Sequence, residues 1–125
     1  MEDIKFNIAN ALAGVYYIAT TDGDQPHVRP FDGAVVFDGK FYIGTAKTKD
    51  VFKQIEKNPK VEIFSMETGV VRFTAEAYAV AEDNLNKDIY SALGKDYNDN
   101  SVAVELKNAK GTFTDSMGEK TEFSF

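Results

Sequence analysis

The sequence predicts a mainly β fold: a small antiparallel barrel of about six to seven strands with two or three short helices. Short runs rich in β-branched and aromatic residues follow one another through turn dipeptides, which is typical of antiparallel strands. Few segments change to helical spacing, so a parallel α/β fold is disfavoured. One long run, residues 70–81, carries small residues on one side, which suits the narrow interior of a barrel.

The first third of the chain predicts one helix and a meander. Ile4, Ile8 and Leu12 recur at helical spacing before Gly14, which indicates a short amphipathic helix ended by a left-handed glycine. Four β-rich runs follow at residues 15–21, 27–31, 34–37 and 40–46, separated by Asp-Gly turns and Pro26. Tight turns between such runs predict antiparallel strands.

The middle of the chain predicts two further helices. Residues 48–58 carry Val51, Phe52 and Ile55 on one face, with Thr48 able to cap the helix and Pro59 after its end. Residues 83–93 have a stripe of Leu85, Ile89 and Leu93 and end at Gly94.

The remaining runs predict strands. Residues 61–66 and 70–81 form two of them, the second with one side made of Val71, Phe73, Ala75, Ala77 and Ala79. Residues 101–116 and 119–125, joined around Gly118, predict a closing hairpin.

Composition limits the possible functions. At 125 residues we expect a single domain spanning residues 1–125. The chain has no Cys and one His, so we expect no metal site, and a formal net charge of -6 disfavours nucleic acid and anionic membranes as partners. No leader or membrane span is evident, and we expect a cytoplasmic protein. Because the chain has no Cys, redox chemistry would need a bound cofactor.

The first candidate site is the basic turn before residues 48–58. Thr45, Lys47, Thr48 and Lys49 join a strand to a helix start. Free backbone N–H groups and the helix dipole attract anions there, and these side chains would add charged hydrogen bonds to a phosphate. The alternative is that Thr48 is only a cap and the lysines only solvated.

The second candidate site is the segment His27–Asp32. Pro30 interrupts a strand, and such breaks lie at edges or irregular stretches, often beside ligands. Alternation places His27, Arg29 and Phe31 on one face, which suits a flat anionic ligand. Alternatively, Arg29 makes a structural ion pair, Phe31 packs in the core, and His27 is a surface or hydrogen-bonded side chain.

These segments resemble the pyridoxamine-phosphate-oxidase-like split-barrel flavoproteins, over about residues 15–80. The resemblance lies in ATTDGDQPHVRPF, in FYIGTAKTKDVFKQIEKNPKVEIFS and in VVRFTAEA. It implies an FMN-binding split barrel in which Arg29, Pro30, Phe31 and Asp32 border the flavin ring. It also implies that Thr45, Lys47, Thr48 and Lys49 hold the phosphate.

The resemblance further implies a homodimer with FMN at its interface and an oxidoreductase acting on a small-molecule redox substrate. The chain also resembles the nitroimidazole-resistance branch of the same superfamily, whose members are nitroreductase-like. The resemblance implies that true pyridoxamine phosphate oxidases carry C-terminal substrate-binding arginines, whereas this chain has no Arg after Arg72, so vitamin B6 oxidation is disfavoured. Arg72 is a further cofactor candidate or, alternatively, a structural ion-pair partner.

The protein could instead be a non-catalytic flavin carrier, a binder of haem or a deazaflavin, or a member that has lost its cofactor. No catalytic side chain is assigned, because a flavin performs its chemistry at its own ring. Phe31, Phe64 and Phe73 are candidates for the groove wall or the subunit contact, or for the core.

Overall fold

The computed structural model describes residues 2–125, and these form three helices and eight strands. The helices are α1 (Glu2–Ala11), α2 (Asp50–Lys57) and α3 (Asp83–Leu93). The strands are β1 (Val15–Asp22), β2 (Gln25–Asp32), β3 (Val35–Phe37), β4 (Lys40–Ala46), β5 (Lys60–Ser65), β6 (Val70–Ala79), β7 (Ser101–Thr114) and β8 (Lys120–Ser124). The predicted mainly β fold is confirmed, with eight strands rather than six or seven.

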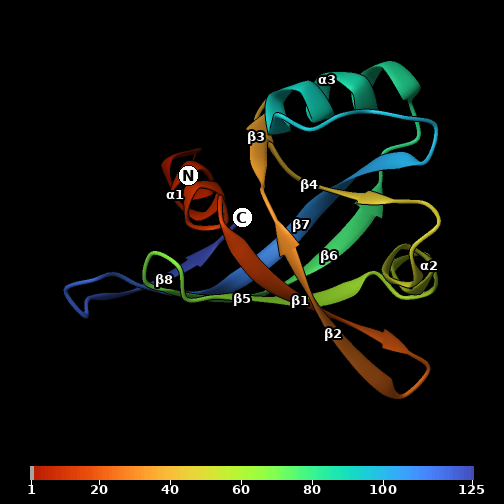
Figure 1. The fold of residues 1–125 in the computed structure, drawn as a ribbon. Helices are drawn as coiled ribbons and strands as arrows, with labels where there is room; N and C mark the ends of the chain where they lie inside the picture. The colour runs from red at the N-terminus through yellow and green to blue at the C-terminus, as the bar shows by residue number, and fades with distance from the viewer. Residues whose placement is uncertain (1) are drawn as a thin grey trace.

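The strands pair antiparallel in the order β2-β1-β5-β6-β7-β4-β3, and β8 pairs with β7. Because β2 and β3 end this order without pairing with each other, the sheet curls but stays open, as a split barrel (Figure 1). The β1–β2 hairpin extends away from the barrel body, at the lower right of Figure 1.

The long strand β7 serves both halves of the barrel. Residues 101–106 pair with β4, and residues 110–114 pair with β8, while β6 runs along its other side. Between these parts the β6 register shifts at Thr74/Glu76, and Asn108 has a positive φ of 53°. Such a bulge bends a strand, which lets β7 turn from one half to the other.

There is no room for a Cβ at Gly111 of β7, which pairs with Phe73 in the middle of β6. On Gly111 it would lie 2.0 Å from the Arg72 carbonyl oxygen and 2.4 Å from the Cβ of Phe73. Only glycine permits this close approach of the two backbones.

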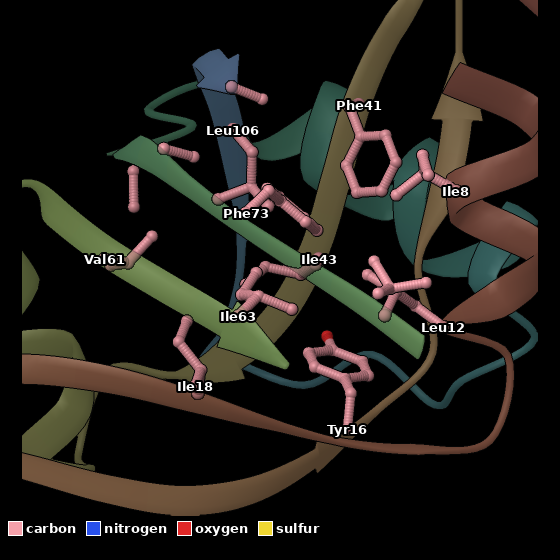
Figure 2. Packing of buried hydrophobic residues seen from close by; sticks show 14 of the residues in the cluster. Ile8, Leu12, Tyr16, Ile18, Phe41, Ile43, Val61, Ile63, Phe73 and Leu106 are labelled. Atoms are coloured by element: carbon pink, nitrogen blue, oxygen red, sulfur yellow. The ribbon is translucent and has the colours of Figure 1, made fainter. Parts of the chain in front are cut away.

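The inner faces of the strands and one side of α1 form the main core. Figure 2 shows Ile8 and Leu12 of α1 packed toward Tyr16, Phe41 and Ile43 from the sheet. Alternation buries Val71, Phe73, Ala75 and Ala77 as predicted, whereas Ala79, at the end of β6, is exposed. A smaller cluster under α3 contains Tyr42, Ile89, Tyr90 and Ala103.

Phe73 belongs to this core and not to a groove wall. Its ring is 1% exposed and packs edge-on against Phe41 and Phe123. The third helix has the predicted bounds, and Gly94 ends it in the left-handed conformation with φ 72°. Among residues 2–125, no helix is long and apolar enough to cross a membrane.

Candidate functional site

A cleft of about 260 Å³ lies where the end of β2, the end of β4 and the segment after α3 meet. Its lining residues are Val15, Pro30, Phe31, Asp32, Gly44, Lys49 and Lys95. The two segments that the sequence singles out therefore meet at one place. The first contributes Pro30, Phe31 and Asp32, and the second contributes Lys49.

Phe31 presents an aromatic ring at this cleft, and Tyr16 packs against that ring. Its ring lies edge-on to Tyr16, with centroids 6.1 Å apart, and the ammonium of Lys49 lies 5.8 Å from its centroid. The Tyr16 hydroxyl donates a hydrogen bond of 2.9 Å to the Gly33 carbonyl. Burial raises the pKa of Tyr16 strongly, so this hydroxyl stays protonated and holds the end of β2 in place.

Asp32 and Lys95 form an ion pair at the cleft. The Lys95 ammonium donates to the Asp32 carboxylate at 2.8 Å and to the Asp32 carbonyl at 2.7 Å. These contacts, and more weakly the charge of Lys49, hold the pKa of Asp32 below its usual value. Two ammonium groups thus face one carboxylate, and the cleft carries a local positive charge in a chain whose net charge is -6.

The basic turn between β4 and α2 is tied to the same segment after α3. The Lys47 amide donates a hydrogen bond of 2.7 Å to the Asn100 carbonyl. The N-cap residue of α2 is Lys49, one residue after the predicted cap Thr48. The Lys49 side chain makes no capping hydrogen bond. Thr48 is therefore not the N-cap, and the first-turn N–H groups of α2 lack a side-chain acceptor from the cap position.

Thr45 carries an unusual hydroxyl in this region. It is 6% exposed, and its Oγ1 is a buried polar atom without a hydrogen-bond partner. Its carbonyl accepts a 2.6 Å hydrogen bond from the Tyr90 hydroxyl of α3. Lys47, Thr48 and Lys49 are exposed, and of these only Lys49 lines the cleft.

Arg29 shares the inner face of β2 with Phe31, as predicted, but its guanidinium has acceptors within the chain. It donates to Thr20 Oγ1 at 2.7 Å and to Gln54 Oε1 at 2.8 Å, with a longer 3.3 Å bond to the Ile18 carbonyl. Thr20 also donates to Gln54. This network, here called the Gln54 clamp, ties β1 and β2 to α2, and Arg29 does not line the cleft.

Arg72 and His27 lie apart from the cleft. Arg72, on the outer face of β6, is 3.8 Å from the Glu62 carboxylate and stacks over Phe64 at 5.6 Å. This agrees with the structural ion pair that the sequence left open. His27 is exposed and lines a different hollow beside α2, together with Lys53 and Gln54.

Sequence reasoning missed Val15, Gly44 and Lys95. Lys95 comes 63 residues after the Asp32 that it contacts, and no local motif signals this pairing. Gly44 lies close to α3: a Cβ there would be crowded, 3.1 Å from the Tyr90 hydroxyl. A glycine within a strand is a recognised signal of close approach, and it could have indicated that α3 packs there.

The fold is an open split barrel, and at its strand ends lies a positively charged cleft lined by the aromatic ring of Phe31. The family model described as pyridoxamine 5'-phosphate oxidase matches residues 10–116. The chain belongs to that family, and the resemblance expected from sequence is confirmed. None of the curated proteins matches it.

Solved structures agree on the fold. A NimC/NimA family protein from Clostridium acetobutylicum is 29% identical, with a TM-score of 0.81, and the match covers 95% of this chain and 93% of that one. General Stress Protein 26 from Bacillus anthracis is 18% identical at a TM-score of 0.63, covering 96% and 98%. HutZ, the haem storage protein from Vibrio cholerae, is 16% identical at 0.64, covering 94% and 98%. The last two likenesses concern the fold alone.

Proposed function

We propose that this protein binds FMN, with the phosphate at the turn between β4 and α2 and the flavin ring against the end of β2. The observation that carries this proposal is the meeting of Phe31, Asp32 and Lys49 at one cleft. A flat ring with a phosphate tail needs an aromatic or apolar wall and, some distance away, a set of cationic and N–H donors. The cleft and the adjoining turn offer both.

The residues present fit a phosphate. The hydroxyl of Thr45, two residues before Lys47, is buried without a partner, but Thr45 does not line the cleft. The support for a phosphate therefore comes from the turn itself. The N-terminus of α2 lacks a side-chain cap, and Lys47, Thr48 and Lys49 lie beside it. Asp50, in the first turn, works against an anion there, so the lysines have to supply the net attraction.

FMN, when bound, would supply transfer of hydride or single electrons at its ring. This chain's own residues would bind and orient it. Phe31, braced by Tyr16, would pack against the ring, and Lys49 and Thr48 would hold the phosphate. Lys95 keeps Asp32 ionised and pinned at the cleft, so the carboxylate acts there as an acceptor and not as an acid. We therefore propose that the protein is an oxidoreductase of a small molecule, with the bound flavin supplying the redox chemistry.

A homodimer with shared cofactor sites is part of the proposal. A cleft of about 260 Å³ is smaller than the roughly 300–1,000 Å³ typical of sites that enclose a drug-sized ligand. One chain therefore offers too little wall to shield a flavin from water. A second chain over the cleft would supply the rest.

Haem is the weaker candidate for the same fold. Haem iron takes an axial His, Cys, Met or Tyr ligand, and none of these is among the residues that line the cleft. His27 lines another hollow. The contacts at the cleft favour an anionic flavin.

The testing experiment compares FMN with riboflavin, which lacks the phosphate. Calorimetric titration should give much tighter binding of FMN, and saturating FMN should raise the melting temperature. No shift at saturation would reject FMN binding, and equal affinities would reject the phosphate assignment. If FMN binds, stopped-flow reoxidation by nitroaromatic and quinone compounds separates the two roles: an oxidoreductase accelerates one of them above free FMN, and a flavin carrier accelerates none.

A further inference from the structure

The Lys95 ammonium at the cleft is held in place through the backbone. The Lys95 N–H donates to the Tyr90 carbonyl at 3.0 Å, directly after the left-handed Gly94, so the end of α3 fixes where this side chain starts. Its stem then lies over Gly33: a Cβ on Gly33 would be 3.4 Å from Cε and 3.6 Å from Nζ of Lys95. The ammonium therefore has a defined position beside Asp32.

The backbone beneath Lys95 is fixed as well. The Gly33 N–H donates to the Leu12 carbonyl at 3.1 Å, and the Gly33 carbonyl accepts the Tyr16 hydroxyl at 2.9 Å. Asp32, which precedes Gly33, pairs with Val15 of β1. A recognition site gains affinity when its groups are already ordered before the ligand binds. Asp32 and Lys95 meet this condition.

The pair keeps a free donor and a free acceptor side by side. An ammonium has three N–H groups, and Lys95 donates to Asp32 Oδ1 at 2.8 Å and to the Asp32 carbonyl at 2.7 Å, which leaves one. An ionised carboxylate can accept about four hydrogen bonds, and Lys95 supplies one of them. The Asp32 side chain is 67% exposed and so can accept another from a ligand. The pair therefore matches a group in which an N–H lies next to a carbonyl, as in an imide.

The charges at the cleft favour a neutral group at this pair. The Asp32 carboxylate offsets the charge of Lys95, so of the two ammonium groups that line the cleft, Lys49 is left to attract an anion. An anionic group at the other end would meet the Asp32 carboxylate. The cleft thus has an anion-binding end at Lys49, an aromatic wall at Phe31 and a neutral hydrogen-bonding end at Asp32 and Lys95.

We propose that Asp32 and Lys95 recognise the pyrimidine edge of the flavin ring, with Asp32 accepting the N3–H and Lys95 donating to a neighbouring carbonyl oxygen. This inference rests on the proposed function and adds the orientation of the ring. The pyrimidine end of a flavin carries an N–H between two carbonyls, whereas the opposite end carries two methyl groups. Methyl groups at the pair would leave its donor and acceptor unsatisfied, at a cost in free energy. Asp32 therefore selects flavins whose N3 carries a hydrogen.

The experiment is calorimetric titration of the full chain with FMN and with 3-methyl-FMN, in which a methyl group replaces the hydrogen on N3. Both compounds have the same phosphate, so the comparison tests the ring alone. We expect methylation to weaken binding to the wild type about tenfold or more, the effect of losing a hydrogen bond to a charged group.

Three variants assign the effect to the pair. In Asp32→Ala the two flavins should bind equally, and Lys95→Ala should weaken both, because the carbonyls are present in both. Asp24→Ala is the matched control, exposed in the turn between β1 and β2 and outside the cleft, and it should keep the full preference for FMN. Melting temperatures establish that each variant is folded.

The outcomes separate this inference from the proposed function. If FMN and 3-methyl-FMN bind the wild type equally, the inference is wrong while FMN binding stands. The same holds if Asp32→Ala keeps the preference for FMN or if Lys95→Ala leaves both affinities unchanged. If neither flavin binds the wild type, the proposed function fails, and the inference fails with it.

Discussion

Lys95, in the segment after α3, donates hydrogen bonds to both the carboxylate and the carbonyl of Asp32 at the end of β2. The pair joins residues 63 positions apart at the mouth of the cleft. It lowers the pKa of Asp32 and anchors the segment after α3. In that segment the Asn100 carbonyl also accepts the hydrogen bond from the Lys47 amide.

Replacing Lys95 should raise the pKa of Asp32. The hydrogen bond from Lys95 is the largest cause of its lowered value, so Lys95→Ala should return it toward the ordinary range, and Lys49→Ala should do so less. A carboxyl group whose pKa is lowered in the folded state stabilises the fold at pH values above its unfolded-state pKa. This stabilisation is lost as the pH falls through the folded-state pKa. Titration of the Asp32 carboxyl carbon by NMR measures this, with Lys107→Ala as control. An unmoved pKa in Lys95→Ala would contradict the assignment.

Lys49→Ala should weaken FMN binding by about 1–3 kcal/mol, the usual range for a lost charged hydrogen bond. Lys53→Ala is the matched control, because Lys53 is exposed on the same helix and lines a different hollow. Calorimetric titration of both variants gives the comparison. If the two lysines prove equivalent, the phosphate does not bind at the β4–α2 turn.

Gln54→Leu should lower the free energy of unfolding by about 1–3 kcal/mol, because Arg29 and the buried Thr20 both lose the acceptor that Gln54 provides. Urea unfolding measures the change. Glu56→Ala, exposed on the same helix, should be close to neutral. A stable Gln54→Leu protein would mean that water replaces the clamp.

Gly111→Ala should cost about 3 kcal/mol or more, since its Cβ would overlap the backbone of Arg72 and Phe73. Gly23→Ala is the comparison: unlike Gly111, Gly23 has a positive φ, 63°, but nothing lies within 4 Å of its Cβ, so only the backbone cost of about 1–2 kcal/mol applies. Thermal or urea unfolding of both variants distinguishes crowding from conformation. Equal losses would show that β6 moves aside.

The strands, helices and fold class follow from the sequence because their signals are local. The stripe of Leu85, Ile89 and Leu93 and the stop at Gly94 gave α3 its observed bounds. Alternation placed Arg29 and Phe31 on one face correctly. Thr48 failed as a cap because Lys49 occupies that position, and helix ends are determined by backbone geometry to within a residue or so.

The site was predictable only in part, because its other contacts are long-range. Of the predicted residues, Pro30, Phe31, Asp32 and Lys49 line one cleft, and Lys95 reaches it from a distant loop. The acceptors of Arg29 come from β1 and α2, and no pattern within HVRPF indicates them. Arg72 stood out in the sequence as a lone cation. Which neighbours it meets depends on the register of β5 and β6, which no local pattern gives.

The division of β7 between two sheet halves has a consequence for how the chain is made. On the ribosome, β4 has emerged long before residues 101–106, and until they appear its backbone groups on that side have no strand to pair with. Strand β7 also pairs with β6, and its residues 110–114 pair with β8. Because β4 and β6 both pair with β7, the barrel can close only after residues 101–114 have been synthesised. Pairing between such distant segments is slow, and strand edges that stay unpaired until then are open to aggregation.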